Sequence, residues 1–217
     1  MNVEELIKEL KAVASLDDAV AMKAYMKNKF DFIGVKTPTR RKLAKAFFKQ
    51  QTDSVIDWNF INEAWNSPYR ELQYAALDYL ESRKKLLTPS DLPRLKKLAQ
   101  TKSWWDTIDF LDRLVGSIIA RFPETKEIIL SWSCDKDFWL RRLAIDHQLL
   151  RKEETDTELL EKILVNNLGQ TEFFINKAIG WALRDYSETN PDWVRDFIER
   201  HQAEMAALSI REGSKYL

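Results

Sequence analysis

The residues whose types could support chemistry lie near the middle of the chain, in the run Lys102-Ser103-Trp104-Trp105-Asp106-Thr107-Ile108-Asp109. An ionised carboxylate can stabilise a developing positive charge and can orient or deprotonate a water molecule. An indole ring attracts a cation through its negative π face. Trp105 and Asp109 are four residues apart, so they would lie side by side on a helix and could serve a reaction that forms a cation. The alternative is a half-buried Trp105 beside a solvated Asp109, with no catalytic role.

The helix that must position this pair is predicted to begin near Ser103, a favourable N-cap residue. No Pro interrupts residues 110–119, and apolar residues recur there at helical spacing. Trp105, Asp109 and Asp112 lie off the apolar stripe, on a neighbouring face. The stripe expected to face the core is Trp104, Ile108, Leu111, Val115, Ile118 and Phe122.

Other catalytic and metal-binding groups are sparse. His147 and His201 are the only histidines and Cys134 is the only cysteine, so we expect no metal site and no internal disulfide. The sequence has no Gly-rich phosphate loop and no Gly-x-Ser-x-Gly motif. His147 lies in an apolar helical stretch and is predicted to be structural. Asp109 is then the best catalytic candidate, and no cofactor is expected.

The chain is predicted to be all-α. It shows no sustained apolar–polar alternation and no Asn-Gly or Asp-Gly turn. Short joints divide it into about a dozen helices, and no linker suits a domain boundary, so we expect a single domain over residues 1–217. The joints are expected near residues 34–38, 51–53, 67–68, 88–89, 122–123, 134–137, 153–156, 169–172 and 190–191.

A repeat of 34 residues runs through the sequence. Its register aligns a small-then-aliphatic pair, and it also aligns three aromatic residues, Trp105, Trp139 and Phe173. Tetratricopeptide repeats share this period, but their Trp, Gly, Tyr and Pro pattern is missing. A curved α-solenoid of HEAT-like helix pairs fits better, and such solenoids bind partners on a concave face. The pairs in register are Ala76-Leu77, Ala144-Ile145 and Ala178-Ile179, with Phe110-Leu111 at the same phase.

Charge is balanced overall but segregated locally. Lys and Arg number 34 and Asp and Glu number 34, so only local clusters can favour an anionic partner. Residues 36–49 carry six cations and no acid. Thr37-Pro38 signals a helix start, and a helix N-terminus near Arg40 and Arg41 is suited to a phosphate. The alternative for this segment is a solvated basic face.

A second basic grouping is predicted on the helix from Glu172 onward. Lys177, Trp181 and Arg184 share one face of that helix at spacings of four and three. Cations interleaved with an aromatic side chain suit a nucleic-acid backbone. No run reaches the roughly 18 apolar residues of a membrane span, and the start of the chain does not resemble a signal peptide. We therefore expect a soluble, cytoplasmic protein that does not bind membranes.

These motifs together resemble the AlkD-type DNA alkylation repair glycosylases, a family of HEAT-like repeat proteins. The resemblance spans almost the whole length, and the Lys-Ser-Trp-Trp-Asp and Lys-Ala-Ile-Gly-Trp runs are its most specific parts. The matching stretches are Tyr25-Met26-Lys27-Asn28, Gly34, Thr37-Pro38-x-Arg40-Arg41, Ala75-Ala76-Leu77-Asp78, residues 101–106 with Asp109, Trp139-Leu140-x-Arg142, residues 173–184, and Leu208-Ser209-x-Arg211-Glu212.

The resemblance implies a monofunctional glycosylase that excises cationic alkylated purines, such as 3-methyladenine and 7-methylguanine, from duplex DNA in base excision repair. It implies a catalytic Asp109, with Trp105 and Trp181 flanking the deoxyribose and no base-flipping pocket. A monomer acting at the bacterial nucleoid is expected. The family pattern has Gln where this chain has Lys36, so a different contact with the opposite strand is expected there. The residues expected to bind DNA are Tyr25, Lys36, Thr37, Arg40, Arg41, Lys102, Arg142, Lys177 and Arg184.

Two other functions remain open on the sequence. The first is a non-catalytic DNA-binding solenoid, which would bind duplex DNA with a salt-dependent affinity but release no base. The second is a protein-interaction scaffold in which the exposed Trp side chains anchor a partner. The joint presence of Asp109, Trp105, Trp181 and Arg142 in the family register favours the glycosylase.

Overall fold

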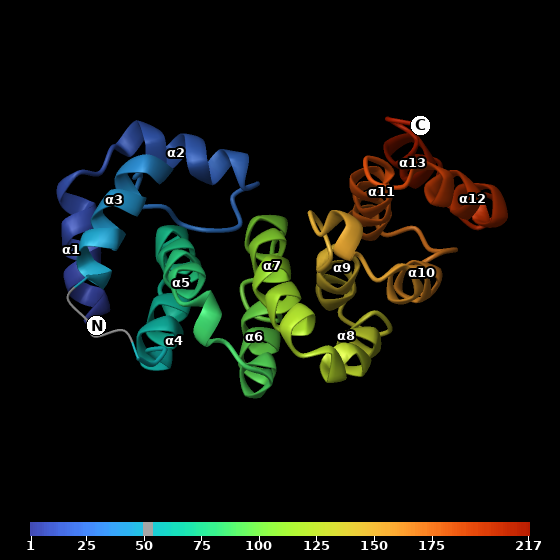
Figure 1. Ribbon diagram of the computed structural model, residues 1–217. Coiled ribbons are helices and arrows are strands. Elements are labelled where there is room, and N and C mark those ends of the chain that lie inside the picture. The colour runs from blue at the N-terminus through green and yellow to red at the C-terminus, as the bar shows by residue number, and fades with distance from the viewer. Residues whose placement is uncertain (50–53) are drawn as a thin grey trace. The chain divides into compact units, whose positions relative to one another are not determined.

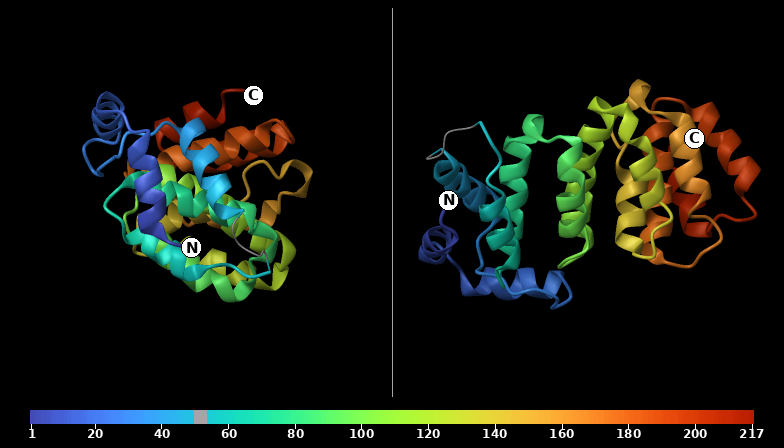
Figure 2. Two further views of the ribbon diagram at one scale, coloured as in Figure 1. Left: turned by 90° about the vertical axis from the view of Figure 1, so that its left-hand side faces the viewer. Right: turned by 90° about the horizontal axis from the view of Figure 1, so that it is seen from below.

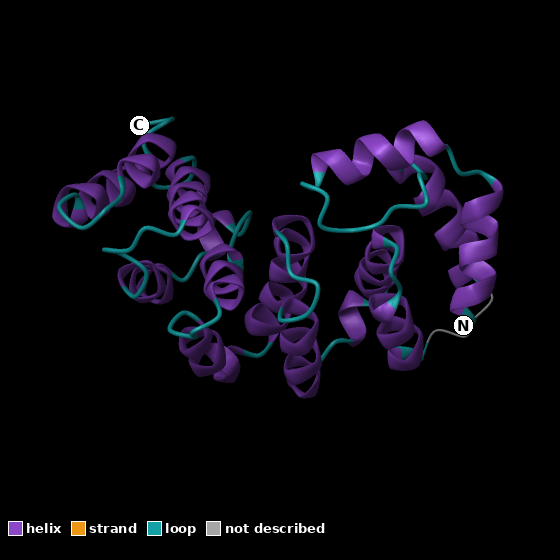
Figure 3. Cartoon of the chain, turned by 180° about the vertical axis from the view of Figure 1, so that it is seen from behind, coloured by secondary structure: helices purple, strands orange, loops and turns teal. Residues whose placement is uncertain are grey.

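The computed structural model describes residues 1–49 and 54–217 of the chain, so the joint expected at residues 51–53 lies outside the described part. Within that part the protein is all-α, as predicted, apart from one isolated parallel bridge between Asp31 and Tyr69 (Figure 3). The helices are α1 (Val3–Ala12), α2 (Leu16–Tyr25), α3 (Thr37–Phe48), α4 (Trp58–Asn66), α5 (Arg70–Ser82), α6 (Leu92–Ala99), α7 (Trp105–Arg121), α8 (Lys126–Trp132), α9 (Phe138–Asp146), α10 (Thr157–Val165), α11 (Phe173–Ser187), α12 (Pro191–His201) and α13 (Ala207–Gly213).

Four short 3-10 turns supplement these helices in the described part of the chain. They lie at the joints, where a Pro or a polar residue interrupts the α-helical hydrogen bonds. The turns are η1 (Lys84–Leu86), η2 (Pro89–Asp91), η3 (Pro123–Thr125) and η4 (Lys152–Glu154). The chain forms two compact units, residues Met1–Leu87 and Thr88–Leu217. The expectation of a single domain over residues 1–217 stays a prediction.

The first unit is built around α5, whose apolar face is fully buried against α3 and α4. Glu71 on α5 is also buried, and its carboxylate accepts hydrogen bonds from the backbone amides of Ile33, Gly34 and Val35. A buried carboxylate is tolerated when several donors satisfy it. These bonds fix the loop that leads into α3, and Lys36 and Thr37 follow directly after it.

The second unit stacks α7, α9 and α11 side by side, with α13 packed on α11 (Figures 1 and 2). The 34-residue repeat is visible in the hydrogen bonds of this unit, because many side chains bond to residues about one repeat away in the sequence. Asn167 donates to the Ser133 carbonyl 34 residues earlier, and the Ser209 hydroxyl donates to the Asn176 carbonyl 33 residues earlier. The predicted helix-pair stacking is thus confirmed within this unit.

Gly116 shows how closely α7 approaches the segment after α9. A Cβ at this position would lie 2.1 Å from the carbonyl oxygen of His147, so only glycine fits. His147 itself is buried, and its Nδ1 lies 2.6 Å from the Ala144 carbonyl oxygen. Burial lowers the pKa of His147 to about 3, so the ring stays neutral, in line with the predicted structural role.

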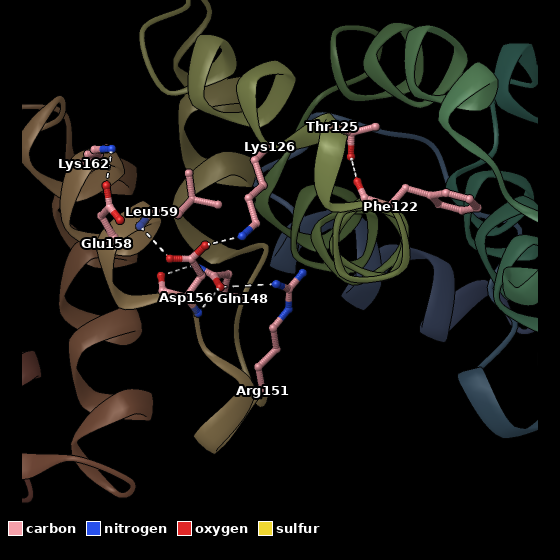
Figure 4. A network of polar contacts seen from close by, with 9 residues as sticks. All are labelled: Phe122, Thr125, Lys126, Gln148, Arg151, Asp156, Glu158, Leu159 and Lys162. Atoms are coloured by element: carbon pink, nitrogen blue, oxygen red, sulfur yellow. Dashed lines mark hydrogen bonds and ion pairs between the residues drawn. The ribbon is translucent and has the colours of Figure 1, made fainter.

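The outer joints of this unit are closed by a polar network around Asp156 (Figure 4). The Asp156 carboxylate accepts hydrogen bonds from Lys126 Nζ at 2.6 Å and from the Leu159 amide at 3.0 Å, which caps α10. Its backbone amide donates to Gln148 Oε1, and Arg151 Nη1 donates to the same oxygen. The network connects α8, α10 and the segment after α9.

No helix in residues 1–49 or 54–217 is long and apolar enough to cross a membrane.

Candidate nucleic-acid repair site

Helix α7 carries Asp109 as predicted, but the helix starts differently. It begins at Trp105, and Trp104 takes the N-cap position without a side-chain capping hydrogen bond. The Ser103 hydroxyl instead donates to the carbonyl of Ala99 at the end of α6. The N-cap role expected for Ser103 is therefore wrong, because the preceding turn uses its hydroxyl.

The Asp109 carboxylate is held by Arg142 of α9. Arg142 Nε donates to Asp109 Oδ1 and Nη2 donates to Asp109 Oδ2, each at 2.8 Å, while Nη1 donates to the Phe174 carbonyl oxygen. The Asp109 side chain is 22% exposed, whereas the Arg142 side chain is 1% exposed. Such a bidentate pair fixes the orientation of both planar groups. The structure thus gives Arg142 partners within the protein, and its expected contact with DNA stays a prediction.

Two buried carboxylates lie close to this pair. Asp112 and Asp146 are each about 1% exposed, and their oxygens lie within 4.8 Å of an Asp109 oxygen and of one another. Asp146 Oδ2 lies 3.7 Å from Arg142 Nη2. A triad of carboxylates could attract a metal ion, but the cation within this group is the guanidinium of Arg142, which already binds both Asp109 oxygens. The expectation of no metal site stays a prediction.

Burial and neighbouring charges shift the ionisation of this cluster. Burial opposes the charged form of Arg142, but Asp146 and Asp109 outweigh it and raise the Arg142 pKa. Burial, reinforced by Asp146 and Asp109, raises the pKa of Asp112 well above its usual range. Burial also raises the pKa of Asp146 to about 7, against the opposing pull of Arg142. Arg142 therefore stays charged, and Asp112 favours its neutral form.

Trp181 of α11 lies beside the same group. The Arg142 guanidinium carbon is 5.2 Å from the centroid of the Trp181 ring, and Lys177 Nζ is 5.7 Å from it. A cleft of about 430 Å³ opens here, to which Asp109 and Trp181 both contribute. The structure therefore brings the predicted carboxylate and one predicted indole to one opening. The remaining lining residues are Asp112, Arg113, Leu149, Leu150, Arg184, Asp185, Glu188, Lys215 and Tyr216.

The basic face of α11 is partly neutralised by Glu212 of α13. Lys177 Nζ and Arg184 Nη1 lie 2.9 Å and 3.1 Å from the two Glu212 oxygens. The Lys177 bond is the main reason that the Glu212 pKa is lowered. Gly180 allows this contact, since a Cβ there would lie 2.5 Å from Glu212 Cβ. The predicted grouping of Lys177, Trp181 and Arg184 on one face is present, with an acidic partner.

Trp105 and Lys102 lie at the start of α7. Trp105 is the first residue of that helix and is half-buried, and Lys102, in the preceding turn, has a φ of +51°. Their expected contacts with sugar and DNA stay predictions.

The other predicted contacts belong to the first unit. Lys36 precedes α3, is 71% exposed, and its Nζ lies 3.1 Å from Asp18 Oδ1. Thr37 is the exposed first residue of α3. Tyr25, the last residue of α2, is also exposed. Arg41 Nε donates to Asp78 Oδ1 at 3.1 Å from an exposed position.

Arg40 differs from its neighbours because it is buried. Its Nη2 donates to Asp78 Oδ2 at 3.1 Å, and its guanidinium carbon lies 4.8 Å from the centroid of the Tyr74 ring. Asp78 thus receives both Arg40 and Arg41. The predicted helix start at Thr37-Pro38 is confirmed, whereas the binding of phosphate there stays a prediction.

Sequence reasoning missed the acidic partners of these cations. Asp146 follows Arg142 by four residues, a spacing that favours an ion pair on one helix face and could have identified it. Glu212 and Asp78 pair across helices, at separations of 28 to 38 residues, so no local spacing indicates them. Asp112 was expected with Asp109 on one face, but the structure buries it.

Comparisons with known proteins identify the family of this chain. A model of the family described as "DNA alkylation repair enzyme" matches residues 6–217. A solved structure described as a predicted DNA alkylation repair enzyme from Enterococcus faecalis shares 34% identity, with a TM-score of 0.87, over 94% of this chain and 96% of that chain. A search of curated proteins gave no match.

More distant structures share the fold. AlkD2 from Streptococcus mutans is 16% identical, with a TM-score of 0.62 over 92% of this chain and 99% of that chain. The alkylpurine DNA glycosylase AlkC from Pseudomonas fluorescens, bound to DNA containing an abasic site analog, is 13% identical. Its TM-score is 0.54, over 99% of this chain and 62% of that chain. The match over residues 6–217, together with the 34% identical structure, shows that this chain belongs to the DNA alkylation repair enzyme family.

Proposed function

We propose that this protein is a monofunctional DNA glycosylase that releases cationic alkylated purines, such as 3-methyladenine and 7-methylguanine, from duplex DNA. The observation that carries the proposal is the Asp109 carboxylate, which Arg142 holds in the lining of a cleft shared with Trp181. Membership of a DNA alkylation repair family supports it. So does the fold shared with a protein described as an alkylpurine DNA glycosylase.

The chemistry that such a site must perform is modest. An N-alkylated purine already carries a positive charge, so the bond from its nitrogen to sugar C1′ breaks with the electron pair going to the base. The base leaves neutral and the sugar becomes an oxocarbenium-like cation. Water then adds to C1′ and loses a proton, which leaves an abasic sugar. The enzyme must stabilise the cation and position the water.

Asp109 is suited to both tasks. A carboxylate has about four acceptor positions on its two oxygens, and Arg142 uses one on each, so Asp109 can still accept a proton or a hydrogen bond from water. The Asp146 carboxylate, 3.7 Å from Arg142 Nη2, adds to the negative potential that the guanidinium would otherwise cancel. Because Arg142 and Lys177 already lie near the Trp181 ring, we assign the larger electrostatic effect to Asp109 and a smaller one to the indole.

Duplex DNA carrying alkylated bases is the proposed partner. The exposed cations Lys36 and Arg41 of the first unit, and the half-buried Lys177 and Arg184 of the second, would contact its phosphates. Tyr25, Thr37, Arg40 and Lys102 complete the proposed contact set, with Trp105 at the sugar. We expect the protein to act as a monomer at the bacterial nucleoid.

The decisive experiment is incubation of the protein with methylated duplex DNA, followed by chromatography of the released bases. We expect release of 3-methyladenine and 7-methylguanine, and a loss of about 10²-fold or more in the Asp109→Asn variant with duplex binding retained. Asp192→Asn, an exposed substitution on α12, is the matched control. Equal turnover by Asp109→Asn would remove this carboxylate from the mechanism. Salt-dependent binding without base release would favour a non-catalytic DNA-binding protein, and no DNA affinity would favour a protein-interaction scaffold.

A further inference from the structure

The cluster formed by Asp109, Asp112, Asp146 and Arg142 contains more acidic than basic side chains. Asp109 and Asp112 come from α7 and Asp146 from α9, and their oxygens lie within 4.8 Å of one another. The guanidinium of Arg142 is the one buried cation in contact with this group among the described residues. Arg113, next to Asp112, is exposed, and Asp185 of α11 adds a further negative charge near Asp146.

Arg142 has no donor directed at the two inner carboxylates within hydrogen-bond distance. Its Nε and Nη2 donate to Asp109, its Nη1 donates to the Phe174 carbonyl, and Asp146 Oδ2 is 3.7 Å from Nη2. Within residues 1–49 and 54–217, Asp112 Oδ1 and both oxygens of Asp146 accept no hydrogen bond. Three buried carboxylate oxygens are therefore without a donor.

Buried oxygens of this kind need a proton or a cation. An ionised carboxylate that is removed from water and left without donors is strongly unfavourable, and the usual response of such a group is to take up a proton. Where oxygens of two carboxyl groups approach to hydrogen-bond distance, the groups can share one proton, since the neutral group then donates a hydrogen bond to the charged one. A proton on Asp112 would supply the missing donor, while Asp146 would keep its charge next to Arg142.

We propose that Asp112 and Asp146 hold one proton between them in the folded protein, mainly on Asp112, and that this neutral carboxyl group positions Arg142 on Asp109. With Asp112 neutral, the single guanidinium is divided between two anions instead of three. The group of four then keeps one excess negative charge beside the cleft. Burial, which raises the pKa of both Asp112 and Asp146, acts in the same direction. Asp112 and Asp146 are positioning residues in this proposal, because they act through Arg142.

The first test is the pH dependence of stability in Asp112→Asn, which imitates the neutral carboxyl group. A carboxyl group whose pKa is raised in the folded state binds a proton that the unfolded chain has lost, so stability falls as the pH rises between the two pKa values. In wild type the unfolding equilibrium constant should therefore rise about tenfold per pH unit, for this one proton, from about one unit above the ordinary carboxyl pKa up to the raised pKa of the folded pair. Asp112→Asn should lose this slope and fold as well as wild type at pH 7.

The surface variant Asp192→Asn is the control and should keep the wild-type slope. An unchanged slope in Asp112→Asn, or a severe loss of stability at pH 7, would show that Asp112 is charged in the fold and would overturn the proposal. Infrared spectroscopy gives a second measurement. The C=O stretch of a protonated carboxyl group should be present in wild type at pH 7 and absent from Asp112→Asn, and its absence from wild type would also overturn the proposal.

A bound cation is the competing explanation. Wild type and Asp112→Asn would be melted with and without Ca²⁺ or Mn²⁺, each at millimolar concentration. The proposal expects no rise in Tm that depends on Asp112. A rise in the Tm of wild type that is lost in Asp112→Asn would mean that a metal ion, and not a proton, neutralises the excess negative charge.

The role of Asp112 in catalysis rests on the proposed function. The presence of one proton on Asp112 and Asp146 does not depend on it. If the protein is a glycosylase, the base-release rates of wild type and Asp112→Asn should differ in their pH dependence. Above the pH at which wild type loses the shared proton, its rate should fall while that of Asp112→Asn stays level. If no base is released by either protein, the glycosylase proposal fails and the stability and infrared results still decide the proton. If bases are released with identical pH profiles, the positioning role fails.

Discussion

The Arg142 side chain makes more contacts within this site than could be predicted from its position in the sequence. It is 1% exposed and binds Asp109, lies near Asp146, and donates to a carbonyl of α11, so one guanidinium joins α7, α9 and α11. Only Arg has five donors in a rigid plane, and neither Lys nor Gln can reproduce this set of contacts. The residue that the sequence assigned to DNA thus also holds the proposed catalytic carboxylate in place.

The loss of this guanidinium should be costly. Removal of one partner from a buried ion pair leaves uncompensated charge, which destabilises a protein by about 3–5 kcal/mol. We therefore expect Arg142→Met to lower the free energy of unfolding by about that amount, measured by urea denaturation at pH 7. Arg195→Met, which breaks an exposed pair within α12, should change it by less than about 1 kcal/mol. Equal effects of the two substitutions would mean that the Arg142 pair is solvated and contributes no more than a surface contact.

At the scale of helices, close packing of α13 on α11 brings Glu212 to the basic face. Gly180 is the residue that permits it, because a Cβ would lie 2.5 Å from Glu212 Cβ and 3.2 Å from the Ser209 carbonyl oxygen. Helix α13 has only seven residues and no side-chain cap, so its position depends on this packing. The close packing of α13 on α11 therefore explains why the Lys-Ala-Ile-Gly-Trp run has a glycine.

Substitution of Gly180 should separate the two helices. We expect Gly180→Ala to destabilise the protein by about 1–3 kcal/mol through overpacking, although Ala is the better helix former. Thermal unfolding measures the loss. Gly169→Asn is the control, since a Cβ there meets no atom within 4 Å and Asn tolerates the φ of +67°. A Gly180→Ala variant at least as stable as wild type would show that α13 can shift at no cost.

Much of this element arrangement could be predicted from the sequence, whereas the charge pairing could not. The 34-residue register aligned Trp105, Trp139 and Phe173, and in the structure they lie in the first turns of α7, α9 and α11. Helical periodicity cannot tell how far a helix is covered by its neighbours, so Asp112 was expected beside Asp109 and is buried instead. Pairs across helices, such as Glu212 with Lys177, depend on tertiary packing that no local spacing encodes.

At the scale of the whole molecule, a net charge of zero means that DNA affinity must come from local cations that are freed from their acidic partners. Glu212 pairs with Lys177 and Arg184 in the second unit, and Asp18 pairs with Lys36 in the first. If a phosphate replaces each acid when DNA binds, the protein gives up ion pairs of low strength for phosphate interactions that release counterions. Glu212 and Asp18 would then limit the affinity for undamaged DNA, because they compete with phosphate for the same cations.

This exchange predicts opposite effects of two substitutions on duplex binding. Glu212→Gln releases two cations, so it should raise the affinity at low salt and steepen the log–log salt dependence by about 0.9 for each further phosphate that these cations neutralise. Lys36→Ala should lower the affinity and reduce the slope by about 0.9 if this side chain meets one phosphate. Fluorescence anisotropy with an unmodified duplex over a salt series gives both slopes. An unchanged slope in Lys36→Ala would exclude its contact with phosphate, and an unchanged affinity in Glu212→Gln would mean that DNA does not reach the basic face of α11.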